Sequence, residues 1–579
     1  METETLLLRH ERIDDIPLLL GFLQKLGLPE LLERHLGSHH LHQGLPNGVL
    51  ATTWIAFILS ESDHRKVRVQ DWAQRHHQLL ERFWGHLVRP VEFSDDRLSI
   101  LLRRLHDADW TVLEADLWQD TCQVYEIPLD CIRLDATTSY GYHQTTPEGV
   151  MQFGHSKDHR PDLPQLKLMA AVAQPTSQMV ACDVVAGNSA DDPLYLPLIR
   201  RVRQQFGRKG LLYAGDCKMA ALETRAEVAA RGDFYLMPLP RTGEVAAQWD
   251  TWIEEALAKP EQLKSLSRPG ADDSPEVFAR GYEWKRDMTA TVDNKLRTWT
   301  ERVQVVQPLG LAERQGQQLE QRLQRAEEEL RGLTPPVKAG HRQHREEATL
   351  QAAVVEVLRV RQVEGLLQVD WEAEVTVQEK YQGRGRGGPQ RPKVKIEKVR
   401  YVIANIRRNE TAIARQKERL GWRLQVTNLT QKRCDLTEAV LIYNEGWSVE
   451  RDFHLLKDRP LGIQPLFVRE EEQILGLTRL LTIALRVLTL IELVMRSQLE
   501  EREEELSGLY EGQAKRTTGK PTAVRLLKAI ARLEITLSCV EGSEGRRWQL
   551  TRLPPLLKRV LSLLGLSSKV YMRLAHNTG

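Results

Sequence analysis

The chain has few cysteines and lacks any close cysteine pair. Its six cysteines form no C-x-x-C motif, and no His/Cys grouping has the spacing of a zinc site. Zinc-binding domains and disulfide-stapled domains both depend on such spacing. The cysteine pattern therefore argues against both architectures and predicts a reducing, cytoplasmic environment.

A long apolar run free of charge is also missing. The N-terminal segment METETLLLRHERIDD is acidic and has no apolar core of the kind found in signal peptides, so we expect none here. The most apolar run, Ile474 to Met495, has the length of a membrane span, but Arg479, Arg486 and Glu492 interrupt it. Because charges at mid-bilayer are costly, we expect a buried helix with one wet edge and no membrane partner.

The chain has almost no net charge. It carries 81 basic and 79 acidic side chains, a net charge of +2, with 41% hydrophobic and 28% charged residues. This composition is ordinary for a folded protein, and 579 residues exceed what one core can hold, so we expect roughly three or four domains. The balance hides local asymmetry, because residues 515–579 hold thirteen Lys or Arg and three Glu, a net charge of +10.

Hydrophobic periodicity divides the chain into five regions. Residues 1–125 predict a helical N-terminal region suited to DNA binding or dimerisation. Residues 126–240 predict the order β-β-β-α-β-α-β, which is an α/β fold with a mixed sheet flanked by helices. Residues 241–428 predict an inserted β-rich domain with a long helix. Residues 429–500 predict further helices, and residues 501–579 predict a basic helical C-terminal region.

Three carboxylates stand out by position. Asp135 follows the apolar CIRL in a predicted strand, Asp216 ends the predicted strand LLYAGD, and Glu450 lies in a predicted helix. Carboxylates at the ends of adjacent strands can meet at a crevice. A third from a packed helix would complete an oxygen-rich cage for a hard cation such as magnesium. An Asp at a strand end is more often a turn or cap residue, so position alone leaves both interpretations open.

Tyr443 and Lys457 stand seven residues before and after Glu450. Seven residues are nearly two helical turns, so we expect the three side chains to form a polar stripe along one helix. Such a stripe faces either solvent or a reaction site.

The strings RLDATT, LLYAGDCKMAA and YNEGWSVERDFHLLKDRPL together resemble the three catalytic motifs of insertion-sequence DDE transposases. The third is similar to the Y-x2-R-x3-E-x6-K signature of the insertion-sequence-four superfamily, and Tyr443, Glu450 and Lys457 fit its spacing. The similarity extends over roughly residues 130–500. It implies an RNase H-like catalytic core in two parts, 126–240 and 429–500, which the β-rich domain interrupts.

The resemblance implies a DNA transposase that binds terminal inverted repeats, cleaves the element ends and transfers the 3′-hydroxyl ends into target DNA. It implies that Asp135, Asp216 and Glu450 hold two Mg²⁺ ions, with Mn²⁺ as an alternative. One ion would activate water and later the 3′-hydroxyl, and the other would stabilise the leaving group. The implied partners are double-stranded DNA and a second copy of the chain, as a homodimer in the active complex. The implied location is the nucleoid-associated cytoplasm of a prokaryote.

The same signature assigns phosphate contacts at the DNA end. Tyr443 and Lys457 are the candidates, and a solvated helix edge is the alternative interpretation. The arginine of the signature falls on Gly446, so Arg451 or Arg423 would have to replace it. This departure puts end binding in question more than metal binding, because all three expected ligand positions are acidic.

Three further segments carry candidate DNA contacts. The polar loop GHSKDHRPD (154–162) offers Lys157 with its neighbours His155 and Arg160, although a plain surface loop fits as well. Trp299 resembles an aromatic that related transposases stack on a flipped base, but a core tryptophan is the commoner explanation. The segment 384–400 holds seven Lys or Arg and one Glu, which suits phosphate contact. Its candidates are Arg384, Arg386, Arg391 and Lys393.

Two other classes of function stay open. A transposase descendant retained for DNA binding would lack catalysis, and Gly446 is the feature that motivates it. A nuclease or resolvase on the same fold would cleave DNA without joining it. A hydroxyl nucleophile at Thr137 or Thr138 is not supported, because neither has a partnering His in a recognisable pattern.

Overall fold

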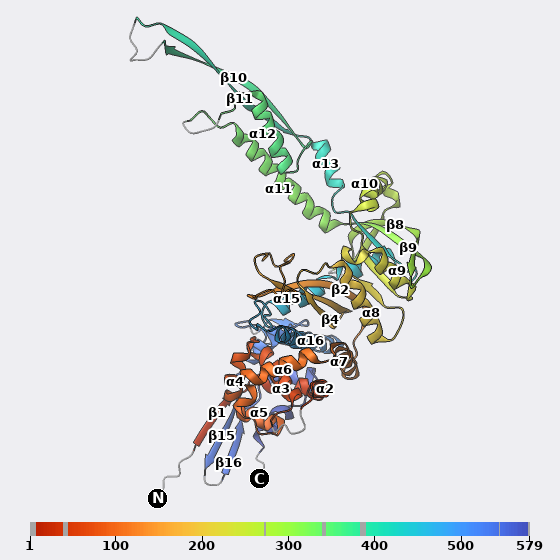
Figure 1. Ribbon diagram of the computed structural model, residues 1–579, viewed down its shortest axis with the longest axis vertical. Helices are drawn as coiled ribbons and strands as arrows, with labels where there is room; N and C mark the ends of the chain where they lie inside the picture. The colour runs from red at the N-terminus through yellow and green to blue at the C-terminus, as the bar shows by residue number, and fades with distance from the viewer. Residues whose placement is uncertain are drawn as a thin grey trace. The chain divides into compact units, whose positions relative to one another are not determined.

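The protein is a mixed α/β fold with a large mixed sheet and many helices (Figure 1). The computed structural model describes residues 7–38, 44–270, 274–338, 343–382, 390–513, 515–542 and 545–576. The chain forms two compact units, which we describe separately. Unit 1 comprises Met1–Met237, Met288–Trp299 and Ala439–Gly579, and unit 2 comprises Pro238–Asp287 and Thr300–Glu438.

Unit 1 contains five neighbouring strands in the order β4-β3-β2-β5-β6. Strands β2, β3 and β4 run antiparallel, while β5 runs parallel to β2 and β6 parallel to β5. Helix α8 (Tyr195–Phe206) leads from β4 to β5, and α9 (Leu222–Ala230) leads from β5 to β6, so the predicted order β-β-β-α-β-α-β is confirmed. The strands are β2 (Leu129–Tyr140), β3 (Gln165–Pro175), β4 (Gln178–Ala186), β5 (Leu212–Ala214) and β6 (Phe234–Pro238).

The N-terminal region of unit 1 is largely helical, as its hydrophobic periodicity predicts. Helix α6 (Asp95–Asp107) begins at Ser94, whose hydroxyl accepts a hydrogen bond from the Arg97 N–H at 3.4 Å. Such a cap satisfies a helical N–H that has no partner within the helix. The other helices of this region are α1 (Ile16–Lys25), α2 (Leu28–Leu36), α3 (Asn47–Glu61), α4 (Lys66–Arg75), α5 (His77–Trp84) and α7 (Trp110–Val124).

Helix α16 (Glu471–Glu501) is the expected buried helix. It is the one helix within the described ranges that is long and apolar enough to cross a membrane, and it packs against α3 and α6 inside unit 1. Its charges have partners. Arg486 pairs with Glu114 of α7, Glu492 pairs with Arg451, and Arg479 donates to the last carbonyls of α6. Pairing offsets the desolvation that makes a buried charge costly.

The terminal regions contain strands that hydrophobic periodicity does not predict. β1 (Leu7–Arg12) pairs with β15 (Thr536–Gly542), and β15 pairs with β16 (Gly545–Leu550). The region after α16 is therefore mixed rather than purely helical. Its other elements are β13 (Leu506–Ser507), β14 (Thr517–Thr518), α17 (Ala523–Ile530), α18 (Pro555–Leu563) and α19 (Lys569–Met572).

Unit 2 contains the strands and the long helix expected between residues 241 and 428. Helix α13 (Glu410–Glu418) begins at Asn409, whose side chain accepts a hydrogen bond from the Ala412 N–H at 3.1 Å. Strands β7 (Lys264–Pro269), β12 (Arg423–Thr427) and most of β8 (Pro275–Val292) and β9 (Lys295–Pro308) lie here, in the order β12-β9-β8-β7. The remaining helices are α10 (Gly243–Ala258), α11 (Leu309–Leu333) and α12 (Glu347–Val360).

A two-stranded ribbon, β10 (Leu367–Tyr381) with β11 (Lys393–Arg408), extends from unit 2 (Figure 1). Near α11 and α12 it packs on a small core that includes Leu323 and Leu350. Farther along, Val377 and Ile396 are exposed. A ribbon without a covering layer is marginally stable alone, so its outer half is suited to contact another molecule.

Candidate active site

Asp135 lies in the middle of β2, and Asp216 follows the end of the neighbouring parallel strand β5. The register pairs Ile132 with Tyr213 and Arg133 with Ala214. Continuing that register by two residues sets Asp135 beside Asp216. The two carboxylates are therefore neighbours, and the charge of Asp216 acts on Asp135.

The surroundings of Asp216 fix its side chain. Its Oδ1 accepts a hydrogen bond from the Tyr195 hydroxyl at 2.6 Å and from the Lys218 N–H at 2.9 Å, which caps a short helical turn. The preceding residue must be small, because a Cβ on Gly215 would lie 2.6 Å from the Met219 sulfur and 3.3 Å from the Leu134 carbonyl oxygen. Gly215 thereby lets the Asp216 segment pass close to the Asp135 strand.

Glu450 comes from a helix that packs on these strands. It lies on α15 (Trp447–Lys457), which contacts β2 and β3, and its side chain is exposed. The expectation of one helix carrying Tyr443, Glu450 and Lys457 is wrong. Tyr443 belongs to a separate helix, α14 (Leu436–Asn444), which ends before α15 begins.

The break between the two helices has a physical cause. The Arg133 guanidinium of β2 donates to the carbonyl oxygens of Ile442 at 2.8 Å and Tyr443 at 3.0 Å. In a continuous helix the Ile442 carbonyl would accept from the Gly446 N–H. That N–H turns instead to the Tyr443 carbonyl at 3.3 Å, which makes a tighter turn.

The three carboxylates interact through their charges. Burial raises the pKa of Asp135, and the negative charges of Asp216 and Glu450 raise it further. The Lys157 ammonium, 3.6 Å from the Asp135 Oδ1, and the Ala136 N–H, 2.7 Å from it, work in the opposite direction. Asp135 therefore sits in a partly buried acidic cluster that a cation would stabilise.

The side chains of this cluster are chemically suited to bind a divalent cation, but they lie too far apart to share one as they stand. Within the described ranges, no three His, Cys, Asp or Glu side chains are close enough together to hold an ion as they stand. Carboxylate oxygens are the ligands that Mg²⁺ and Mn²⁺ prefer, and Lys157 is the positive charge that now faces Asp135. Binding would require the carboxylates to turn toward a common point.

The loop at residues 154–162 is part of this site. The Lys157 ammonium lies between the Asp135 carboxylate and the Ala136 carbonyl oxygen, to which it donates. Arg160 pairs with Asp162 at 2.8 Å and stacks over the Tyr140 ring. Lys157 therefore faces the acidic cluster, and its contact with DNA stays a prediction.

Lys457 pairs with a residue that we did not single out from the sequence. Its ammonium lies 2.6 Å from the Asp158 carboxylate, and both side chains are only 15% exposed. The other Asp158 oxygen accepts from the Thr138 hydroxyl at 3.1 Å and from the Gln464 amide at 2.8 Å. Lys457 is thus held inside the protein, whereas its assignment to DNA-end phosphates is still only a prediction.

Arg133 occupies the space beside Gly446. A Cβ at Gly446 would lie 3.0 Å from the Arg133 Nη1, and the same guanidinium stacks over the Tyr443 ring at 5.4 Å. The two replacements that we considered for the signature arginine lie elsewhere. Arg451 pairs with Glu492 of α16, and Arg423 is on β12 of unit 2.

The remaining candidate DNA contacts have local partners or lie outside the described residues. The Trp299 indole N–H donates to the Tyr235 hydroxyl at 2.8 Å, and the ring is partly buried. Lys393 pairs with Glu379 at 3.2 Å on the ribbon, and Arg391 shortly precedes its second strand. Arg384 and Arg386 lie outside the described residues.

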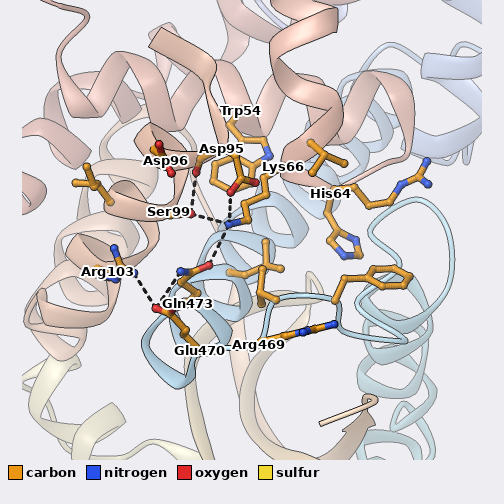
Figure 2. A pocket seen from close by; sticks show the side chains of 16 residues that line it. Trp54, His64, Lys66, Asp95, Asp96, Ser99, Arg103, Arg469, Glu470 and Gln473 are labelled. Atoms are coloured by element: carbon orange, nitrogen blue, oxygen red, sulfur yellow. Dashed lines mark hydrogen bonds and ion pairs between the residues drawn. The ribbon is translucent and has the colours of Figure 1, made fainter. Parts of the chain in front are cut away.

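A cavity of about 760 Å³ lies elsewhere in unit 1. The N-terminal helices and the start of α16 line it (Figure 2). On its wall Lys66 bonds to Asp95, Ser99 and Gln473, and Arg103 bonds to Glu470. None of the three acidic candidates lines this cavity, so it is separate from the candidate active site.

Reasoning from the sequence missed Arg133, Asp158 and Gln464. Asp158 stands in the polar loop 154–162, directly after the candidate Lys157. A charged residue beside a candidate was the signal that could have found it. Arg133 and Gln464 carried no local signal, because their partners are distant in the chain.

Comparison with known proteins gives one family. The sequence model for the transposase DDE domain matches residues 128–486. No curated protein matches the chain. Among solved structures, a similar chain is the piggyBac transposase in a synaptic complex with hairpin DNA; it is 8% identical with a TM-score of 0.35, covering 90% of this chain and 80% of that chain.

Proposed function

Because the chain belongs to the transposase DDE domain family, we propose that it is an insertion-sequence transposase of the insertion-sequence-four superfamily. Such an enzyme cleaves the ends of its element and joins the 3′-hydroxyl ends to target DNA. The observation that carries the proposal is the register that sets Asp135 beside Asp216, with Glu450 interacting electrostatically with Asp135. Family membership alone would not assign these three residues.

We further propose that the strands of unit 1 form an RNase H-like core. In that fold the first Asp lies on the first strand, the second on the fourth, and the Glu on a late helix. Asp135 is on the first strand of the sheet, Asp216 directly follows the fourth, and Glu450 is on α15, which agrees with this assignment. Most of the sequence between β6 and α14 would then be an insertion.

Members of the family generally use divalent metal ions, and we assign Asp135, Asp216 and Glu450 as the ligands of two Mg²⁺ ions, with Mn²⁺ as an alternative. When bound, the ions supply activation of the attacking oxygen and stabilisation of the leaving oxygen. The protein supplies the rest. Tyr195 and the Lys218 N–H orient the Asp216 carboxylate, and the partly buried position of Asp135 strengthens its attraction for a cation.

The substrate in this proposal is double-stranded DNA, both terminal inverted repeats and target. Lys157 faces the Asp135 carboxylate, and its ammonium is a positive charge suited to contact the scissile phosphate there. The β10–β11 ribbon, with Arg391 and Lys393, supplies a second basic surface. Cleavage of paired ends calls for two copies of the chain in the active complex.

The test uses purified protein, Mg²⁺ and duplexes that carry the inverted repeats flanking the gene. Wild type should cleave at the repeat ends, and Asp135→Asn should not. If wild type and Asp135→Asn both leave the cognate ends intact, the interpretation as a catalytic transposase fails and a DNA-binding descendant takes its place. Cleavage without joining would favour a nuclease.

A further inference from the structure

Helix α15 is tied to the strands at its N-terminal end. Arg133, two residues before Asp135 on β2, donates to the final carbonyls of α14 at 2.8 Å and 3.0 Å. From β3, the Gln174 amide donates to the Glu445 carbonyl at 2.9 Å and to the Ser448 hydroxyl at 3.1 Å. Arg133 is only 5% exposed, so it acts within the protein rather than on its surface.

The same helix is tied at its C-terminal end. Lys457 pairs with Asp158 at 2.6 Å, and Asp158 also accepts from Thr138, three residues after Asp135 on β2. Gln464, in the segment after the helix, donates both to Asp158 at 2.8 Å and to the Thr138 carbonyl at 3.1 Å. One carboxylate thus joins β2, the loop at 154–162, α15 and the segment that follows α15.

Glu450 lies between these two attachments. It is in the first turn of α15, nearly two turns before Lys457, and its charge acts on Asp135 of β2. Carboxylates that repel one another need a support that keeps them in place when no cation is bound. The two attachments supply that support, because they connect the Glu450 helix to the strand that carries Asp135.

We propose that Arg133 and the Lys457–Asp158 pair are positioning residues, which fix α15 to β2 and so set Glu450 at a constant distance from Asp135. This inference rests on the proposed function for its meaning, but its contacts are independent of that function. It assigns Lys457 an internal role in place of a phosphate contact. It also assigns two roles within the charged loop at 154–162. Asp158 holds α15 in place through Lys457, and Lys157 faces the Asp135 carboxylate.

The affinity for a cation distinguishes a positioning role of Lys457 from a purely electrostatic effect of its charge. Loss of an outer support typically lowers metal affinity about 10–100-fold. Loss of a positive charge near an acidic cluster does the reverse, because it removes repulsion of the cation. Lys457→Met should therefore weaken Mn²⁺ binding if Lys457 positions Glu450, and should strengthen it or leave it unchanged if Lys457 is a free cation.

The experiment titrates the full-length chain with Mn²⁺ alone by calorimetry and follows hydrogen exchange of the α15 amides. Variants are Lys457→Met, Asp158→Asn, Arg133→Ala and the reciprocal swap Asp158→Lys with Lys457→Asp. The matched control is Lys66→Met, since Lys66 is similarly buried, at 17% exposed, and pairs with Asp95 on the wall of a cavity that none of the three acidic candidates lines. We expect the three single variants to lose affinity roughly tenfold or more and to exchange faster in α15. The swap should recover part of both, and the control should change neither.

Unchanged or tighter Mn²⁺ binding in Lys457→Met, with unchanged exchange in α15, would overturn the proposal. Absence of Mn²⁺ binding in the wild type would count against the proposed function instead. In that case exchange in α15 still tests the attachments: faster exchange in the single variants, reversed by the swap, supports them, and unchanged exchange rejects them. If Lys457→Met fails to fold, Mn²⁺ affinity and α15 exchange are compared between wild type, Asp158→Asn and the swap. In Asp158→Asn the amide oxygen can still accept from Lys457, and in the swap the two opposite charges are exchanged.

Discussion

Asp216 has a structural and a proposed chemical role, and two substitutions separate them. Asp216→Ala removes the cap on the Lys218 N–H, worth about 0.5–2 kcal/mol. It also removes the acceptor of the buried Tyr195 hydroxyl, and a hydrogen bond to a charged group contributes about 1.5–3 kcal/mol. Relief of repulsion with Asp135 offsets part of this loss. We expect a net destabilisation of roughly 1–4 kcal/mol, given these ranges.

Asp216→Asn keeps an oxygen in the same place, so both hydrogen bonds persist in weaker, neutral form. We expect it to change the free energy of unfolding by no more than about 1 kcal/mol, because a neutral hydrogen bond replaces a charged one and repulsion falls. Its cleavage rate should nonetheless fall by at least ~10³-fold, as for other essential groups of an active site.

Urea unfolding of the full-length chain and a timed cleavage assay on the same preparations measure both effects. The reasoning is refuted if Asp216→Asn cleaves within tenfold of wild type. It is refuted equally if Asn and Ala destabilise the protein to the same extent, because the two hydrogen bonds would then contribute nothing.

Three further predictions address other parts of the molecule. Replacing Arg391 and Lys393 with Gln should lower the slope of log affinity for duplex DNA against log salt by about 0.9 per lost phosphate contact, and an unchanged slope would remove the ribbon from the DNA surface. Burial raises the pKa of Asp15 to about 7 from about 3.9 in the unfolded chain, so folding stability falls as pH rises between these values. Asp15→Asn should thus stabilise the protein at pH 8 but not at pH 4 in thermal unfolding, and an equal effect at both would contradict the assignment. Glu114→Ala should destabilise the protein by about 3–5 kcal/mol in urea, because it leaves the Arg486 guanidinium buried without its carboxylate, while Arg201 keeps Asp183 as a partner. A loss below about 1 kcal/mol would show that water replaces the carboxylate beside Arg486.

The order of strands and helices along this part of the chain was predictable because the strands are short and apolar. The run QLKLMAAVA of β3 is buried along its whole length, and a strand covered on both faces has this continuous pattern. The acidic positions on the sheet were predictable for the same reason, since each follows an apolar run that periodicity identifies. Which strands are neighbours, and hence that Asp135 meets Asp216, required the structure.

Contacts between distant parts of the chain were not predictable. The break before α15 depends on Arg133, whose partner carbonyls lie more than 300 residues away. The pairing of β1 with β15 joins segments more than 500 residues apart, and the polar β1 has no strand pattern of its own. The Lys457–Asp158 pair belongs to the same class, because local spacing placed Lys457 on a helix face without indicating what that face meets.

The most direct test of the central claim is a strand-transfer assay with purified protein, Mg²⁺, a duplex carrying the gene's flanking inverted repeat and a supercoiled target plasmid. We predict that wild type joins the 3′-hydroxyl end of the repeat to the plasmid and that Asp216→Asn forms no joined product. Absence of joined product with wild type on its own repeats, under conditions where it binds them, would contradict the assignment of this chain as a catalytic transposase.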